Sequence, residues 1–136
     1  MPQVHINYVA VVVAALVSMI LGAIWYAPPV FGNVWMQLIG KKPEDLQTGA
    51  MPQAYSMMFV AALVLSFVLA HVLRWANAMT AIGGVKVALT MWIGFVLTTS
   101  AGGFIFEGRP VKLYWLVNGY QGVALVLMGL ILAVWA

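Results

Sequence analysis

The stretch LYWLVNGYQGVALVLMGLILAVW, Leu113 to Trp135, contains no charged residue. As a helix rising about 1.5 Å per residue it would cross the ~30 Å hydrocarbon core of a bilayer. Three apolar segments of similar length precede it, at about 8–26, 54–73 and 85–106. In lipid, only helices or closed barrels satisfy every backbone polar group, and continuous apolar runs are not the alternating strands of a barrel. We therefore expect one all-α integral membrane domain over 1–136, with four transmembrane helices in an up-down bundle.

The overall composition agrees with a lipid environment. Hydrophobic residues make up 65% of the chain and charged residues 7%, against roughly 45–50% and about 25% in soluble domains. The net charge of +3 comes from few, scattered groups, which predicts contact with anionic lipid headgroups and no nucleic-acid partner. The absence of cysteine excludes disulfides, thiol catalysis and Cys-ligated metals.

Charges concentrate between the apolar segments and indicate how the chain is threaded. The first and third connections carry four Lys or Arg residues, and the side with the termini carries two. The positive-inside rule then favours connections one and three in the cytoplasm and both termini on the non-cytoplasmic side. Aromatic residues bracket the spans as an interfacial belt should, except for Trp92, which falls inside the third span and could face protein or lipid.

The first connection is long enough to hold structure. In VFGNVWMQLIG, residues 30–40, apolar residues recur at helical spacing and Gly40 is a candidate C-terminal cap. The following KKPEDLQTG, residues 41–49, has the proline, acidic residues and final glycine of another short turn of helix. We expect an interfacial amphipathic segment over about 29–49.

Small residues repeat every four positions in three spans. Such ridges let helices approach closely in lipid, where no hydrophobic force drives helices together. They could face the bundle or a partner chain, and ordinary packing is the simpler interpretation. The ridges include Ala14, Ser18 and Gly22 in the first span, Ser66 in the second, and Thr90, Gly94, Thr98 and Gly102 in the third.

Polar groups at membrane depth are costly and are therefore candidate functional residues. Asn118 and Gln121 lie three apart in the fourth span, so we expect them to share a helix face. They could line a small cavity that binds a ligand or water, or they could form interhelical hydrogen bonds with Thr98, Thr99 or Ser100. The second interpretation is the simpler one.

The third connection, IFEGRPVKLYW, holds Glu107 and Arg109 beside Gly108 and Pro110. They could pair at the headgroup boundary and set the turn, or Glu107 could bind a ligand or proton near a polar cavity. No catalytic residue, cofactor site or metal site is predicted, since no nucleophile with its base and no ligand cluster is visible. His5 and His71 are expected to be ordinary interfacial histidines.

Four blocks together resemble a family of small bacterial membrane proteins, domain-of-unknown-function family 1761. The blocks are NYVAVVVAALVSMILGAIWYAPPVFGNVWM, PEDL, FEGRPVKLY and VNGYQGVALVLMG. The resemblance covers nearly the whole chain and implies a four-span, multi-pass protein of the bacterial inner (plasma) membrane. It implies no activity, catalytic residue or cofactor. The family's pattern often has histidine where this chain has Gln121, so a role of that histidine would not carry over.

Three functions follow as hypotheses. The first is a non-enzymatic structural or accessory module, packing with itself or with other membrane protein subunits through its small-residue ridges. The second is a small-solute transporter or permeation element acting as a dimer; all three carboxylates lie in or beside connections, so proton-coupled cation export would lack its central acid. A membrane enzyme ranks last, because the residues it would need are missing.

Overall fold

The computed structural model describes residues 6–39 and 51–135, which form helices and no strands. The elements are α1 (Tyr8–Trp25), η1 (Pro28–Gly32), α2 (Asn33–Ile39), α4 (Met51–Trp75), α5 (Ala81–Met91), η2 (Trp92–Leu97), α6 (Thr98–Glu107) and α7 (Val111–Val134). Four helices are long and apolar enough to cross a membrane: Tyr8–Trp25, Tyr55–Trp75, Ala81–Glu107 and Val111–Val134. This confirms the expectation of an all-helical, multi-pass membrane protein.

The boundaries of the spans differ slightly from the expected ones. The third span begins at Ala81 and not near position 85, because the Thr80 hydroxyl caps it by accepting a hydrogen bond from the Gly83 amide at 3.0 Å. Lys86 therefore lies inside α5, where its exposed side chain can reach toward the headgroups. Helices η1 and α2 fall within the expected interfacial segment, whose remaining part, with Gly40 and Gly49, lies outside the described residues.

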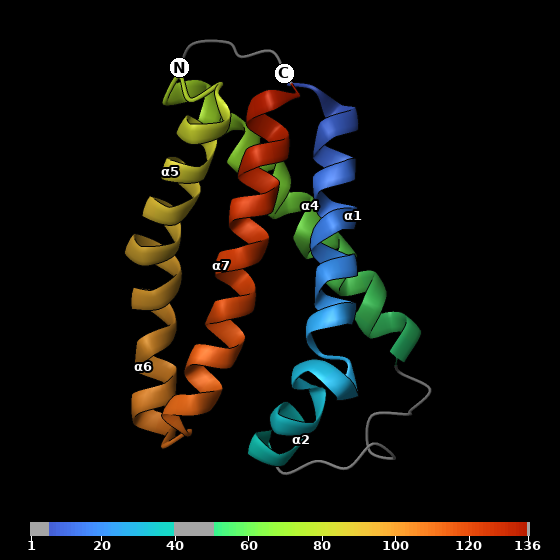
Figure 1. Ribbon diagram of the computed structural model, residues 1–136, viewed down its shortest axis with the longest axis vertical. Helices are drawn as coiled ribbons and strands as arrows, with labels where there is room; N and C mark the ends of the chain where they lie inside the picture. The colour runs from blue at the N-terminus through green and yellow to red at the C-terminus, as the bar shows by residue number, and fades with distance from the viewer. Residues whose placement is uncertain (1–5, 40–50, 136) are drawn as a thin grey trace.

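Helix α7 is the centre of the assembly. It packs against α1 on one side and α5 on the other, while α4 crosses behind and contacts both α1 and α7 (Figure 1). Half of the most apolar 18-residue stretch of α7 is buried, compared with 11% for the third span. In Figure 1, α1 descends and α7 ascends, and the Asn7 side chain donates to the Trp135 carbonyl at 3.2 Å, which holds their ends together.

The α5–α7 contact is a backbone-to-backbone approach made possible by glycine. A Cβ added at Gly84 would lie 2.6 Å from the Gly129 carbonyl oxygen, and one at Gly129 would lie 2.8 Å from the Gly84 oxygen. Ala88 and Ala133, four residues further on in each helix, are both fully buried. Because lipid does not push helices together, this close contact supplies much of the attraction between the third and fourth spans.

The ridges expected in the first two spans lie between helices. Ala14 and Ser18 are buried, and Ser66 of α4 donates a hydrogen bond to the Val11 carbonyl of α1 at 2.8 Å. Gly22 lies against the Tyr120 hydroxyl, 3.1 Å from where its Cβ would be. These four residues therefore serve the chain's own packing.

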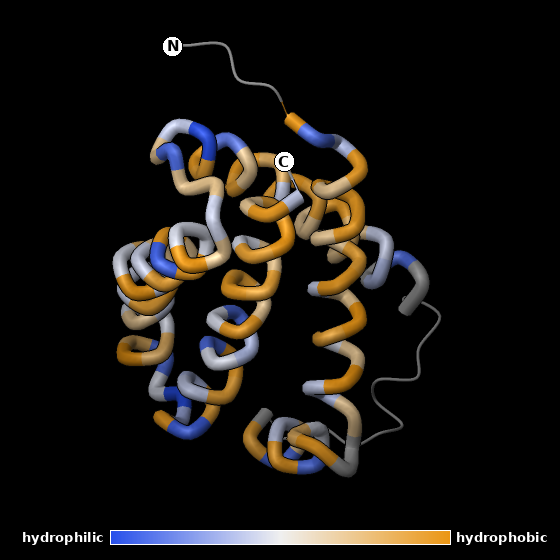
Figure 2. The backbone as a smooth tube through the Cα atoms, turned by 45° about the horizontal axis from the view of Figure 1, so that its top comes forward, coloured by the Kyte–Doolittle hydropathy of each residue, from blue (hydrophilic) through white to orange (hydrophobic). Residues whose placement is uncertain are grey.

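The third-span ridge behaves differently. Cβ atoms at Gly94 and Gly102 would meet nothing within 4 Å, and Thr90 and Thr98 are exposed. The ridge thus faces away from the described part of the bundle. Figure 2 shows hydrophobic residues running along the helices and hydrophilic ones gathering mostly at the turns, as a lipid-facing exterior requires.

Candidate functional site

Asn118 forms a buried polar centre between the third and fourth spans. Its side chain is 2% exposed, its amide nitrogen donates to the Tyr114 carbonyl at 2.9 Å, and its side-chain oxygen accepts from Ser100 at 3.1 Å. The backbone oxygen of Asn118 also accepts a 2.8 Å hydrogen bond from the Trp92 indole. Of the three hydrogen-bond partners expected for Asn118, Ser100 is the one that bonds to it. The Asn118 side chain therefore contributes to helix packing.

A run of hydroxyl groups covers the wide helical turn η2. In such a turn the backbone hydrogen bonds are rearranged, so its carbonyl groups need additional donors in lipid. Four successive carbonyls each accept a side-chain hydroxyl: Gly94 from Thr98, Phe95 from Thr99, Val96 from Ser100 and Leu97 from Tyr114. The hydroxyl hydrogen of Thr98 is therefore used within the third span, although the side chain is exposed.

Gln121 lines a different space, a cavity of about 220 Å³ between α1, α4 and α7. Ser18 and Met19 of α1 and Met58 of α4 contribute to its wall. Within residues 6–39 and 51–135, the Gln121 carboxamide has no hydrogen-bond partner, whereas every fully buried side-chain polar atom of those residues has one. The carboxamide of Gln121 therefore keeps accessible surface and remains free to bind another molecule.

Asn118 and Gln121 contact different parts of the bundle. Positions three apart differ by about 60° around a helix, and α7 is packed on more than one side. That angle is enough to direct Asn118 toward the third span and Gln121 toward the cavity beside α1 and α4.

An aromatic cluster closes one end of the α1–α7 contact. The Tyr120 hydroxyl donates to the Ser18 carbonyl at 2.8 Å, and the Trp25 indole donates to the Leu116 carbonyl at 3.2 Å. The rings of Trp25 and Tyr120 are 6.4 Å apart. Each of these side chains links α1 to α7 through one hydrogen bond from its polar group. The link therefore needs no charged residue in lipid.

The third connection is a tight turn set by Gly108. This residue has a left-handed backbone with φ of 68°, and the Arg109 amide hydrogen-bonds back to the Phe104 carbonyl at 3.1 Å. Glu107 and Arg109 form the expected ion pair, with 2.7 Å between Oε2 and Nε. Both side chains are more than half exposed, at 56% and 53%, so the pair contributes at most about 1 kcal/mol.

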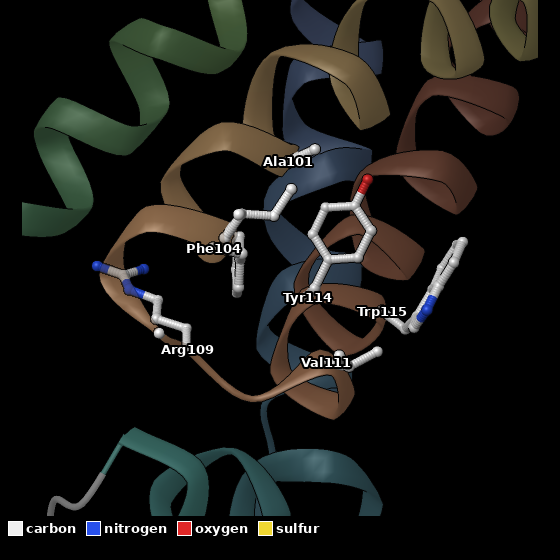
Figure 3. A pocket seen from close by; sticks show the side chains of 8 residues that line it. Ala101, Phe104, Arg109, Val111, Tyr114 and Trp115 are labelled. Carbon is white, nitrogen blue, oxygen red and sulfur yellow. The ribbon is translucent and has the colours of Figure 1, made fainter.

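Beside this turn, α6 and α7 separate around a pocket of about 430 Å³ (Figure 3). Phe104 and Tyr114 form its inner wall and Trp115 lies on the far side, while Arg109 is directed outward. The Arg109 guanidinium lies 5.4 Å from the centre of the Phe104 ring. Because the Tyr114 hydroxyl already donates to Leu97, the pocket offers mainly apolar and aromatic surface.

Metal binding and serine chemistry have little support in the part of the chain that the structure describes. No group of three His, Asp or Glu residues there could hold a metal ion. His71 contacts the Phe67 carbonyl at 2.8 Å and packs beside Trp75, while His5 lies outside the described residues. Ser18, Ser66 and Ser100 each hydrogen-bond to a backbone carbonyl of the bundle.

Comparison with known families agrees with the resemblance seen in the sequence. The model of a family described as "Protein of unknown function (DUF1761)" matches residues 9–133. The chain belongs to this family. No curated protein and no solved structure matches the chain. Family membership therefore covers all four spans but carries no activity, and the function must be argued from the geometry above.

Sequence reasoning identified Gln121, Glu107, Arg109 and Asn118 as notable but did not predict the roles of Trp92 and Tyr114. Both side chains donate hydrogen bonds between the third and fourth spans. A signal was available, because Trp92 lies at membrane depth, where an indole N–H needs a partner. The Gly84 and Ala88 spacing, repeated as Gly129 and Ala133, was equally readable.

Proposed function

We propose that the chain is a non-enzymatic membrane module that associates with a second copy of itself through the outer face of its third span. The observation that carries the proposal is the third-span ridge, here defined as Thr90, Gly94, Thr98 and Gly102, which has no packing partner in the described part of the chain. Elsewhere, Gly84, Gly122 and Gly129 have a neighbouring helix within 3 Å of a Cβ.

The ridge is one continuous face despite the wide turn within it. The Thr98 hydroxyl bonds to the Gly94 carbonyl at 2.6 Å, so these residues are stacked along the helix. Gly102 follows one helical turn later and Gly103 beside it is equally open. Exposed glycine next to threonine provides the flat surface on which a second helix can approach closely.

The small buried fraction of the third span supports the same proposal. Only 11% of its most apolar stretch is buried, and α6 makes few contacts with α7. After α5, the third span is held to α7 by side-chain hydrogen bonds of Trp92, Ser100 and Tyr114, and its outer face stays uncovered. A self-complementary contact around a two-fold axis is the commonest way for identical subunits to satisfy such a face.

The proposal includes a membrane arrangement. The four spans form an up-down bundle with both termini on the non-cytoplasmic side of the bacterial inner membrane, and η1 and α2 lie in the opposite interface. Antiparallel α1 and α7, with Asn7 beside Trp135, support the bundle. The Lys and Arg residues of connections one and three support the orientation.

The test uses the absence of native cysteine. Single variants Thr98→Cys and Gly102→Cys are oxidised in native membranes, with Val64→Cys as the control, since Val64 of α4 is 57% exposed. We expect disulfide-linked dimers at positions 98 and 102 and little at 64, because bridging requires Cα atoms within about 7 Å. Absence of dimers at both ridge positions, or equal yield at Val64, would refute the contact.

A cross-link to a foreign protein would instead indicate an accessory subunit of a larger complex. The transporter hypothesis has weaker support. Its polar residues do not line one path, because Asn118 and Ser100 bond to each other while Gln121 lines a separate cavity.

A further inference from the structure

The Gln121 end of the cavity lies near the middle of the membrane, while Met58, three residues after the α4 span begins at Tyr55, lies nearer the interface. Gln121 is ten residues beyond Val111, where α7 begins, which corresponds to roughly 15 Å along the helix and half of a ~30 Å hydrocarbon core. Ser18 and Met19 also lie near the middle of their span. A free carboxamide at this depth lacks the water that would satisfy it near the surface.

The size and lining of the cavity limit which molecules could enter it and hydrogen-bond to the Gln121 carboxamide. Its 220 Å³ is below the roughly 300–1,000 Å³ of sites that enclose a whole drug-sized ligand. It therefore holds a small polar head whose remainder extends into lipid. The wall exposes more apolar than polar surface and includes no charged side chain, so an ionic head would be left unpaired.

The α4 side of the cavity provides a route from lipid. Met58 and Leu65 line the cavity and are 51% and 36% exposed, so the wall they form also faces the hydrocarbon. The thioethers of Met58 and Met19 are flexible and make favourable contacts with flat, polarisable rings. Tyr120 adds an aromatic side chain, but its hydroxyl hydrogen already bonds to Ser18.

The depth of Gln121 in the membrane restricts which lipid-soluble hydrogen-bond acceptors can reach its carboxamide. Ester carbonyls of phospholipids, and the heads of fatty acids and alcohols, are held at the headgroup boundary, roughly 15 Å from the bilayer centre. A neutral ring ketone with an apolar tail has no strongly hydrated group and can enter the centre. Its carbonyl oxygen matches the two N–H donors of Gln121.

We propose that this cavity binds the ring of a neutral, lipid-soluble quinone, with the Gln121 amide donating to a ring carbonyl and the tail leaving past Met58 into lipid. Only binding is inferred, with no electron transfer. The site does not depend on self-association, because it lies on α1, α4 and α7 and not on the third-span ridge.

The experiment titrates the purified full chain in lipid nanodiscs with decyl-benzoquinone and records tryptophan fluorescence. Trp25 is a suitable reporter, because its ring is 6.4 Å from that of Tyr120 in the cavity wall. Quinone that only partitions into the lipid quenches tryptophan fluorescence linearly with its concentration. Quinone bound at a specific site adds a component of quenching that saturates. Four proteins are compared: wild type, Gln121→Leu, Ala62→Phe, which fills the cavity, and Gln37→Leu, which removes an exposed amide of α2.

We expect saturable quenching in wild type and Gln37→Leu, with about tenfold weaker binding in Gln121→Leu, as loss of one hydrogen bond implies. Ala62→Phe should leave only the linear part. Decylbenzene, which has the tail but no carbonyl, should not compete. Linear quenching alone in wild type, as a cavity filled by water or by lipid chains would give, overturns the proposal. Equal affinity in Gln121→Leu overturns it as well, provided circular dichroism shows both proteins equally helical.

Discussion

The indole Nε1 of Trp92 donates a 2.8 Å hydrogen bond to the backbone carbonyl of Asn118, one turn before Gly122, on which the indole ring rests. This contact marks where the third span changes from backbone contact with α7 to side-chain contact. Before it, Gly84 and Gly129 bring the two backbones together, and after it α6 diverges around the pocket near Tyr114. The wide turn η2 begins at Trp92, so the indole lies where the helical geometry changes.

A methyl group at Gly122 should therefore destabilise the protein. Its Cβ would lie 2.8 Å from Trp92 Cε2, which forces the indole off its hydrogen bond at a cost of about 1–3 kcal/mol. Unfolding in mixed micelles measures the change. Gly103→Ala is the matched control, since its Cβ meets nothing within 4 Å; equal destabilisation of the two variants would contradict the packing described.

Gly129→Ala should disrupt the α5–α7 seam. The new Cβ would lie 2.8 Å from the Gly84 carbonyl and 3.1 Å from the Ala88 Cβ, and backbone atoms cannot yield as a flexible side chain can. We expect loss of at least about 2 kcal/mol, in the upper part of the range for overpacked sites. The same unfolding assay applies, and wild-type stability would show that the two helices are not in contact.

Ser100 and Asn118 should be energetically coupled. A double-mutant cycle with Ser100→Ala and Asn118→Leu removes the 3.1 Å side-chain bond between the third and fourth spans. Interhelical hydrogen bonds in membranes average about 0.6 kcal/mol and reach about 1.7, so a coupling energy in that range is expected. Strictly additive single effects would mean that the two groups do not interact.

The third connection should depend more on Gly108 than on its ion pair. Gly108→Ala places a side chain in the left-handed region, at a cost of about 1–2 kcal/mol. Glu107→Gln breaks an exposed pair worth at most about 1 kcal/mol, and less in high salt. Unfolding at low and high salt separates the two effects, and a larger loss for Glu107→Gln would reverse the ranking.

The four spans could be predicted from the sequence because hydrophobic length is a local property. The four spans are 18 to 27 residues long, close to the roughly 20 apolar residues that cross the hydrocarbon core as a helix. The turn at Glu107 and Arg109 was also readable, since Gly108 and Pro110 each restrict the backbone locally.

The order of the helices around α7 could not be read from the sequence. Small residues occur at four-residue spacing on several faces of the third span, and only the partner helix decides which face is used. The chain uses Gly84 and Ala88, leaving Gly94 and Gly102 open. The same reason separates Asn118 from Gln121, because a central helix presents different neighbours to residues only 60° apart.

The measurement that tests the central claim most directly is the mass of the assembled protein released gently from native membranes, compared with a Gly94→Leu, Gly102→Leu double variant. A Cβ at either of these open positions meets nothing within 4 Å in the described chain, so we expect the fold to accept leucine there while close approach of a second ridge is blocked. We predict a homodimer for wild type and a monomer for the variant. A wild-type monomer, or a variant that remains dimeric, would contradict self-association through the third span.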